Sequence, residues 1–145
     1  MFTVQQVVSY FNQRGSTVFM AAIDATKAFD RVCHVKLFKK LVERNVPHCL
    51  IAVLWDWYDK LYAVVIWNGA TSRMFPVKCG VRQGGVLSPW LFNIYVDDLI
   101  ARLEHSRNGC YVGGYFLGCI MYADDLLLLS VPVSGLQSML DICCS

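Results

Sequence analysis

The sequence has no apolar run long enough to cross a membrane, although 56% of its 145 residues are hydrophobic. A membrane-spanning helix needs about 20 predominantly apolar residues. The longest runs, such as Cys49–Trp55 and Leu61–Trp67, are far shorter, and each is closed by a charged residue or by Asn-Gly. We therefore expect a soluble chain with a large core, or a piece of a larger protein, and no membrane partner.

The chain also lacks a strong charge of either sign, because its formal net charge is only +2. Such a balance does not by itself indicate a nucleic-acid partner. Basic side chains do gather in two segments, which contain His34, Lys36, Lys39, Lys40 and Arg44 in one and Arg73, Lys78 and Arg82 in the other. Because such clusters are more often solvated helix faces than binding sites, they leave the partner undecided.

None of the seven cysteines belongs to a Cys-x-x-Cys pair, and no His-x-x-x-His stands nearby. These spacings argue against the common zinc sites. Most of the cysteines stand among apolar residues, where a free thiol behaves as a small hydrophobic group. Their odd number favours a reducing, intracellular setting, with nucleus and cytoplasm both open. The first residues lack the basic start and apolar centre of a secretory signal.

Apolar periodicity predicts alternating helices and strands. We expect helices over roughly 4–13, 35–43, 48–59 and 89–105 and from about 134, and strands over 18–23, 118–122 and 126–131. Residues 61–67 and 73–79 are expected to pair around Asn68-Gly69, with a loop longer than two residues. Helices mixed with largely antiparallel strands indicate an α+β layer fold.

Two adjacent carboxylates, Asp124 and Asp125, stand between two apolar runs that are typical of buried strands. Carboxylates at the tip of a buried hairpin repel each other unless a cation lies there. Asp24 ends another apolar strand, and paired strands that both end in aspartates can bring these groups together. Carboxylates suit Mg²⁺ or Mn²⁺, and two such ions can activate a hydroxyl and stabilise a leaving phosphate oxygen. An Asp-Asp pair alone is more often an ordinary turn.

A glycine-containing segment, residues 80–89, precedes the predicted helix over 89–105. Its glycines let the backbone approach a ligand closely, and the amide of Gln83 can both donate and accept hydrogen bonds. Ser88 is a candidate cap for the helix. Taken alone, the segment is typical of a turn before a helix.

Together, three ordered segments resemble motifs of the reverse transcriptase family, in the form found in non-LTR (LINE-like) retrotransposon polymerases. Residues 22–30 (AIDATKAFD) resemble the A motif, residues 80–93 the B motif, and residues 122–125 (YADD) the C motif. Their order and intervals also match, over nearly the whole chain. The resemblance implies a polymerase palm-like antiparallel sheet packed against helices. Residues 1–145 would be one partial domain, with a small remnant of the fingers and no thumb.

The resemblance also implies a two-metal centre. Asp24, Asp124 and Asp125 would be the catalytic and metal-binding residues for two Mg²⁺ ions, with Mn²⁺ as a substitute. Tyr122 would lie near the end of the primer, although it could instead fill the core.

The family's nucleotide-binding positions fall on Ala25, Phe29, Arg82, Gln83 and Gly84. The backbone at Ala25 would approach the triphosphate, and Gln83 would lie against the sugar and base. Phe29 would be the steric gate that disfavours a ribose 2′-hydroxyl, although it could instead be a core aromatic.

These roles imply an RNA-directed DNA polymerase in which a primer 3′-hydroxyl attacks the α-phosphate of a deoxynucleoside triphosphate and pyrophosphate leaves. The partners would be an RNA template, a DNA primer and the missing fingers and thumb regions or a larger polyprotein. The alternative is an inactive retrotransposon remnant that acts at most as a nucleic-acid-binding or interaction module. An RNA-dependent RNA polymerase is more distant, because Phe29 and the Tyr-Ala-Asp-Asp turn favour deoxynucleotides.

Overall fold

The computed structural model describes residues 2–25, 27–82, 84–122 and 125–144. The chain divides into two compact units, one made of Met1–Thr26 and Val96–Ser145 and the other of Lys27–Tyr95. Helices alternate with short antiparallel strands, which confirms the predicted α+β class. The prediction of one partial domain stays a prediction. Within the described ranges, no helix combines the length and the apolar character that crossing a membrane would require.

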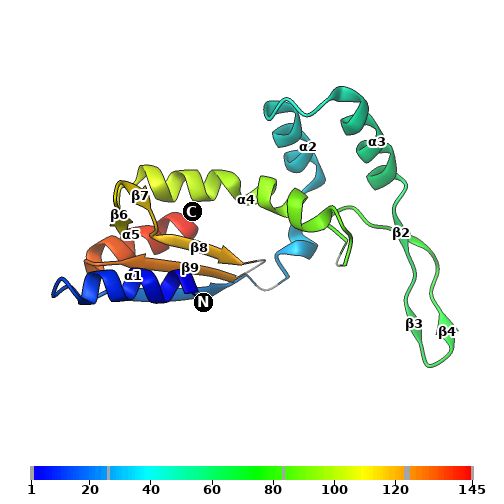
Figure 1. Ribbon diagram of the computed structural model, residues 1–145. Helices are drawn as coiled ribbons and strands as arrows, with labels where there is room; N and C mark the ends of the chain where they lie inside the picture. Colours follow the sequence, from blue (N-terminus) through cyan, green and yellow to red (C-terminus); the bar gives the residue numbers. More distant parts are fainter. Residues whose placement is uncertain (1, 26, 83, 123–124, 145) are drawn as a thin grey trace. The chain divides into compact units, whose positions relative to one another are not determined.

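The first unit contains a three-stranded antiparallel sheet with the strand order β1–β9–β8. These strands are β1 (Phe19–Asp24), β8 (Cys119–Tyr122) and β9 (Asp125–Ser130). Helix α1 (Phe2–Asn12) contributes apolar side chains to one face of the sheet, whereas α4 (Ser88–His105) and α5 (Val133–Cys144) contribute them to the other (Figure 1). The central strand β9 is a run of leucines because both of its faces are covered.

Alternate residues of β9 supply the two halves of the core of the first unit. Leu128 packs with Leu103 of α4 and Met139 of α5, and all three side chains are fully buried. Leu129 packs on the opposite face, against Val7 of α1. Burying one leucine stabilises the fold by about 1.5–3 kcal/mol, so this sheet has a stable centre.

Two short hairpins show how glycine controls strand pairing. In the first unit, β6 (Tyr111–Val112) pairs with β7 (Tyr115–Phe116). The two residues between them, Gly113 and Gly114, both have positive φ, as tight hairpin turns require. This hairpin was not among the predicted strand pairs, although Gly-Gly between β-branched and aromatic residues is a known signal.

In the second unit, β3 (Ile66–Trp67) pairs with β4 (Ala70–Thr71) around Asn68-Gly69. The prediction of a longer loop was wrong, because these two residues alone form the turn, with φ of 47° and 78°. The two long strands that we expected are also interrupted: Tyr62–Ala63 (β2) pairs with Phe75–Pro76 (β5) as a separate ladder. Pro76 lacks an amide hydrogen and therefore limits that ladder.

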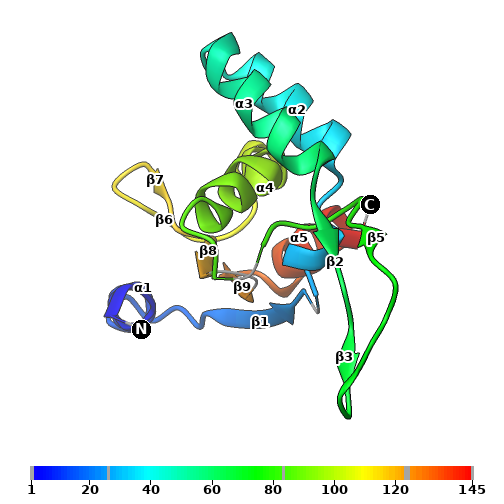
Figure 2. The same cartoon turned by 90° about the vertical axis from the view of Figure 1, so that its right-hand side faces the viewer.

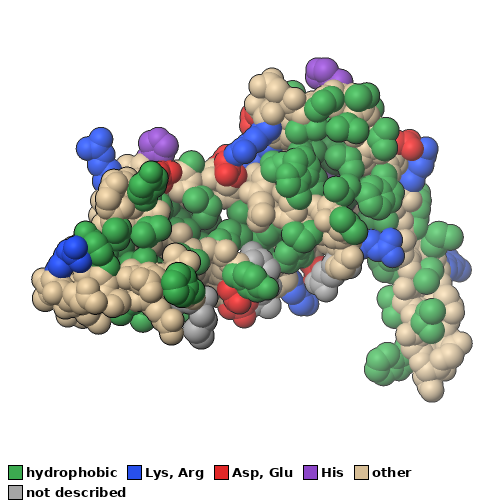
Figure 3. Space-filling model, viewed as in Figure 1, with side chains coloured by type: hydrophobic (Ala, Val, Ile, Leu, Met, Phe, Trp, Pro, Cys, Tyr) green, Lys and Arg blue, Asp and Glu red, His purple; other side chains and the backbone are tan. Residues whose placement is uncertain are grey.

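Apolar side chains remain exposed along this hairpin and on a neighbouring helix of the same unit (Figure 3). Trp67, at the hairpin tip, is 81% exposed. Helix α3 (His48–Asp59) exposes Leu50, Val53 and Trp57. Large exposed apolar surfaces typically mark interaction sites.

Helices α2 (His34–Glu43) and α3 lie side by side in the second unit (Figure 2). The ring of Phe38 meets Trp55 and Tyr58 edge-on, with ring centroids 4.9 and 5.9 Å apart. Such contacts add about 0.5–1.5 kcal/mol each beyond the area that they bury. The helix pair thus has a small aromatic core of its own.

Two segments distant in sequence cross in the second unit, residues 29–34 and residues 79–82, and we call this contact the crossing. The amide of Gly80 donates to the carbonyl of Val32 at 2.8 Å, and the amide of Val81 donates to that of Phe29 at 2.7 Å. The imidazole Nε2 of His34 donates to the carbonyl of Gly80 at 2.8 Å. The crossing is therefore held mainly by hydrogen bonds to the backbone.

Gly80 is required at the crossing for two reasons. Its φ is +90°, a conformation that side chains with a Cβ rarely adopt. A Cβ at this position would also lie 2.9 Å from the carbonyl oxygen of Asp30. The backbones could not approach so closely with any other residue.

We expect Gly80→Ala to lower the free energy of unfolding by about 2–4 kcal/mol, because left-handed strain and a backbone clash add together. Gly69→Ala is the matched control, since Gly69 has φ +78° but open space around its Cβ, and should cost only about 1–2 kcal/mol. All four tryptophans lie between residues 27 and 95, so urea denaturation followed by tryptophan fluorescence reports on this unit. Equal costs for the two variants would contradict the close approach.

Candidate functional site

Three of the predicted site residues form a row across the sheet of the first unit. Asp24 of β1 is paired directly with Asp125 of β9, and Asp125 is paired with Tyr122 of β8. Residues directly opposite one another on neighbouring strands project from the same face, with Cβ atoms about 4.5–5.5 Å apart. All three are exposed, and Tyr122 is 83% exposed. We call these residues the acidic row.

Strand periodicity assigns the acidic row to one face of the sheet. Side chains alternate between the two faces, so Asp125 shares a face with Leu127 and Leu129. Leu128, one residue out of phase, packs against α4 and α5 on the other face. The row therefore lies on the face that is opposite α4 and α5, at the ends of β1 and β8 and the start of β9.

The two carboxylates of the row are suited to a divalent cation. Like charges directly opposite on neighbouring strands destabilise a sheet, and a cation between them would offset the repulsion. Mg²⁺ typically binds through one or two carboxylates, with water and substrate phosphates as its remaining ligands. Asp24 and Asp125 fit this pattern, since both are exposed and project from the same face of the sheet.

The third predicted carboxylate, Asp124, lies outside the described residues. In the described ranges, no group of three or more His, Cys, Asp or Glu side chains comes together. The structure therefore brings together two of the three predicted metal ligands. Ala25 follows Asp24 directly and is exposed at the end of β1.

The ring of Phe29 stacks on that of Phe92 in the second unit, with centroids 4.5 Å apart and planes 23° apart. Phe92 is buried and Phe29 is half-buried. The core-aromatic alternative for Phe29 thus has a definite packing partner, while its role as a steric gate stays a prediction.

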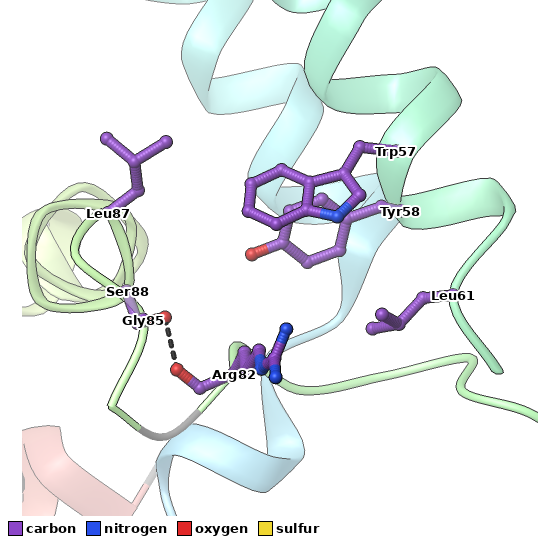
Figure 4. Close-up of a pocket in the computed structure, with 7 residues that line it drawn as sticks. All are labelled: Trp57, Tyr58, Leu61, Arg82, Gly85, Leu87 and Ser88. Carbon is purple, nitrogen blue, oxygen red and sulfur yellow. Dashed lines mark hydrogen bonds between the residues drawn. The ribbon is translucent and has the colours of Figure 1, made fainter. Parts of the chain in front are cut away.

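Arg82 lies at the start of the glycine-containing segment of the second unit, beside the side chains of Tyr58 and Leu61 (Figure 4). Its carbonyl accepts hydrogen bonds from the amide of Gly85 at 2.9 Å and from the hydroxyl of Ser88. The hydroxyl of Ser88, the first residue of α4, therefore connects the helix to the start of this segment. The prediction of a helix cap did not include this interaction. A Cβ on Gly85 would lie 2.7 Å from the Ser88 Oγ and 3.0 Å from the Arg82 carbonyl oxygen, so a side chain here would disturb this turn.

The cavity beside Arg82 is too small for a nucleotide. Its volume of about 20 Å³ accommodates roughly one water molecule. Burial raises the pKa of the Tyr58 hydroxyl, which lines this cavity, so Tyr58 stays protonated at neutral pH. Gly84 has φ +76° and open space around it, and Gln83 lies outside the described residues.

Two basic residues of α2 have different kinds of partner. Lys39 forms a 3.7 Å ion pair with Glu43 on the surface of the helix, which is typical of a solvated helix face. The Nζ of Lys40 instead donates to the distant carbonyl of Tyr95 at 2.7 Å, in a half-buried contact.

Comparison with known proteins adds independent information. Residues 2–144 match the family model described as reverse transcriptase (RNA-dependent DNA polymerase). The chain is 30% identical over 138 residues to the retrovirus-related Pol polyprotein from the type-2 retrotransposable element R2DM of Drosophila melanogaster, a match that covers 95% of this chain and 13% of that protein.

Two further relatives come from related elements. The retrovirus-related Pol polyprotein from the type-1 element R2 of Nasonia vitripennis is 32% identical over 85% of this chain and 12% of its own length. The RNA-directed DNA polymerase from the mobile element jockey of Drosophila melanogaster is 31% identical over 83% of this chain and 13% of its own length. The chain thus spans about an eighth of each of these three relatives.

These R2 and jockey relatives confirm the predicted resemblance to non-LTR retrotransposon polymerases. Because the family model matches almost every residue, the chain belongs to the reverse transcriptase (RNA-dependent DNA polymerase) family.

Proposed function

We propose that this chain is the metal-binding, palm part of an RNA-directed DNA polymerase that works together with neighbouring segments of a larger polyprotein. Its substrates would be an RNA template, a DNA primer and deoxynucleoside triphosphates. The acidic row carries this proposal, because it places two of the family's predicted metal ligands opposite each other at an exposed end of the sheet. The printed names of the relatives, which include an RNA-directed DNA polymerase, support the same chemistry.

In this proposal Asp24 and Asp125, together with Asp124, hold two Mg²⁺ ions. When bound, the ions help to ionise the primer 3′-hydroxyl and neutralise charge on the phosphates and the leaving pyrophosphate. The protein contributes position: the β1–β9 ladder holds the two described carboxylates in register before substrate arrives. Such preorganisation is a large part of the catalytic contribution in phosphoryl transfer.

Tyr122 is suited to a contact with the primer end. Its ring is almost fully exposed in the same row as the two carboxylates, so it is accessible to a base or a sugar. Aromatic rings stack on bases with little sequence preference, which suits a residue that must accept every primer end. The backbone at Ala25 would approach the triphosphate, and Phe29, Arg82, Gln83 and Gly84 would contact the incoming nucleotide.

Asp24→Asn should weaken Mn²⁺ binding about tenfold or more, because one charged oxygen ligand is lost. Binding can be followed by the electron paramagnetic resonance of free Mn²⁺ during titration of the folded chain. Asp141→Asn is the control, since Asp141 lies on α5 and accepts a hydrogen bond from Gln137. Equal Mn²⁺ affinities in the two variants would remove Asp24 from the metal site.

Primer extension on an RNA template should fall by about 100-fold or more in Asp125→Asn, because electrostatic stabilisation of the transition state is lost. The assay is run with the chain alone and with the chain joined to the flanking segments of an R2 relative, each with deoxynucleotides and Mg²⁺. Extension that depends on Asp125 in either form supports the enzyme. No extension in both forms, together with retained Mn²⁺ binding, would favour the inactive remnant.

Phe29→Val should raise ribonucleotide incorporation, relative to deoxynucleotide incorporation, by about tenfold or more if the ring excludes a 2′-hydroxyl. The ratio of kcat/KM for the two nucleotide types measures this discrimination in the active form. Phe92→Leu is the control, because it removes the stacking partner of Phe29 and leaves the Phe29 ring in place. If both variants changed the ratio equally, Phe29 would act only through packing.

A further inference from the structure

Two cysteines face each other at the crossing of the second unit. Cys33 and Cys79 form an isolated antiparallel bridge, outside the named strands. The amide of Gly80 donates to the carbonyl of Val32, so the hydrogen bond lies one residue beyond the cysteine pair on each segment. This pattern defines a non-hydrogen-bonded pair, the type in which opposite side chains are closest.

The backbone spacing of such a pair suits a disulfide. Directly opposite Cα atoms in non-hydrogen-bonded pairs are about 4.5 Å apart. Disulfides connect Cα atoms roughly 4.4–6.8 Å apart, so the typical spacing of such a pair falls within this range. Both thiols are free in this structure. Only side-chain rotation would then be needed to join them.

The crossing holds these two residues in place. Hydrogen bonds from Gly80, Val81 and His34 connect the two segments next to the cysteines. The side chains of Val32 and Val81 are buried beside them. The two thiols therefore stay near each other without any covalent bond, and their effective concentration is high.

At least one of the two thiols is accessible to a reagent in solution. Cys79 is exposed and Cys33 is half-buried. Cys79 also lines an open hollow of about 650 Å³, together with Tyr62 and Arg82. A small-molecule disulfide can therefore reach Cys79 from this side.

Other cysteines of the chain are less suited to oxidation. Cys110 is fully buried, and burial raises the pKa of its thiol. Burial, with a smaller contribution from Cys143, raises the pKa of Cys119 to about 11, and burial also raises the pKa of Cys143. Because the thiolate is the reactive form, these thiols react slowly at neutral pH.

We propose that Cys33 and Cys79 are a redox-sensitive pair, which a small-molecule disulfide such as oxidised glutathione converts into an intramolecular disulfide. The Cys79 thiolate attacks one glutathione sulfur, the glutathione S–S bond breaks, and one glutathione leaves. The Cys33 thiolate then attacks the Cys79 sulfur, and the second glutathione leaves. The two protein thiols lose two electrons and two protons, and one oxidised glutathione becomes two reduced glutathiones.

The disulfide would lock the crossing covalently. It would join the segment that follows residues 22–30 to the residue that directly precedes residues 80–93. In a reducing setting the pair would remain as two thiols, and an oxidising change would close it. This inference does not depend on polymerase activity.

The test treats the folded chain with graded ratios of oxidised to reduced glutathione, alkylates the remaining thiols and maps the linked peptides by mass spectrometry. We expect loss of both free thiols in a Cys33–Cys79 linked peptide. Its yield should be about tenfold or more above the yield in concentrated urea, where proximity is lost. Tryptophan fluorescence of the same samples confirms that the chain is folded.

Two variants distinguish proximity from general reactivity. In Cys33→Ser, Cys79 should remain as a stable mixed disulfide with glutathione, because no second thiol can displace it. Cys49→Ser changes an exposed cysteine elsewhere and should leave the Cys33–Cys79 linkage unchanged. If both cysteines of the unchanged chain end as mixed disulfides, or if the linkage forms equally in urea, the proposal is overturned. The same mapping on the chain joined to the flanking segments of an R2 relative gives a second measurement if the chain alone does not fold.

Discussion

The register between β1 and β9 is the constraint on which the candidate site depends. Four apolar pairs, from Met20↔Leu129 to Ile23↔Leu126, precede the pairing of Asp24 with Asp125. Burial of one leucine such as Leu128 contributes about 1.5–3 kcal/mol. Like charges directly opposite each other destabilise a sheet, but single cross-strand pairs typically change its stability by only about 0.2–1 kcal/mol. Because a slip of one residue would exchange the two faces of β1, the apolar pairs keep the two aspartates opposite each other.

The second unit depends on a different kind of interaction. Its crossing relies on hydrogen bonds to the backbone and on the absence of a side chain at Gly80. Each of these hydrogen bonds contributes only about 0.5–1.5 kcal/mol net to the stability of the fold. The crossing matters mainly because it fixes the spacing between the end of residues 22–30, which resemble the A motif, and the start of residues 80–93, which resemble the B motif. The Cys33–Cys79 pair is a direct consequence of that spacing.

Local patterns were enough to predict much of the fold. The helix over 48–59 begins and ends where apolar periodicity placed it, and the leucine run of β9 agrees with the predicted buried strand. The pairing of strands that end in aspartates also followed from their apolar flanks. Two other contacts between distant segments could not be predicted, because neither the Phe29–Phe92 stack nor the Cys33–Cys79 bridge has a local signal. The hairpin around Asn68-Gly69 was predicted, but its loop was expected to be longer because the second strand was expected to begin only at residue 73.

The repulsion between Asp24 and Asp125, which the sheet tolerates, favours binding of a cation at the proposed metal site. In the unfolded chain Asp24 and Asp125 are separated by most of the sequence, so they bind a cation independently and weakly. Burial of the apolar pairs on folding offsets the cost of bringing the two carboxylates together, and a bound cation then removes the remaining repulsion. By linkage, a ligand that binds the folded row more tightly than the unfolded chain must stabilise the fold. In the proposed polymerase, the stability of the apolar β1–β9 pairs therefore limits how much repulsion between carboxylates the site can tolerate before substrate arrives.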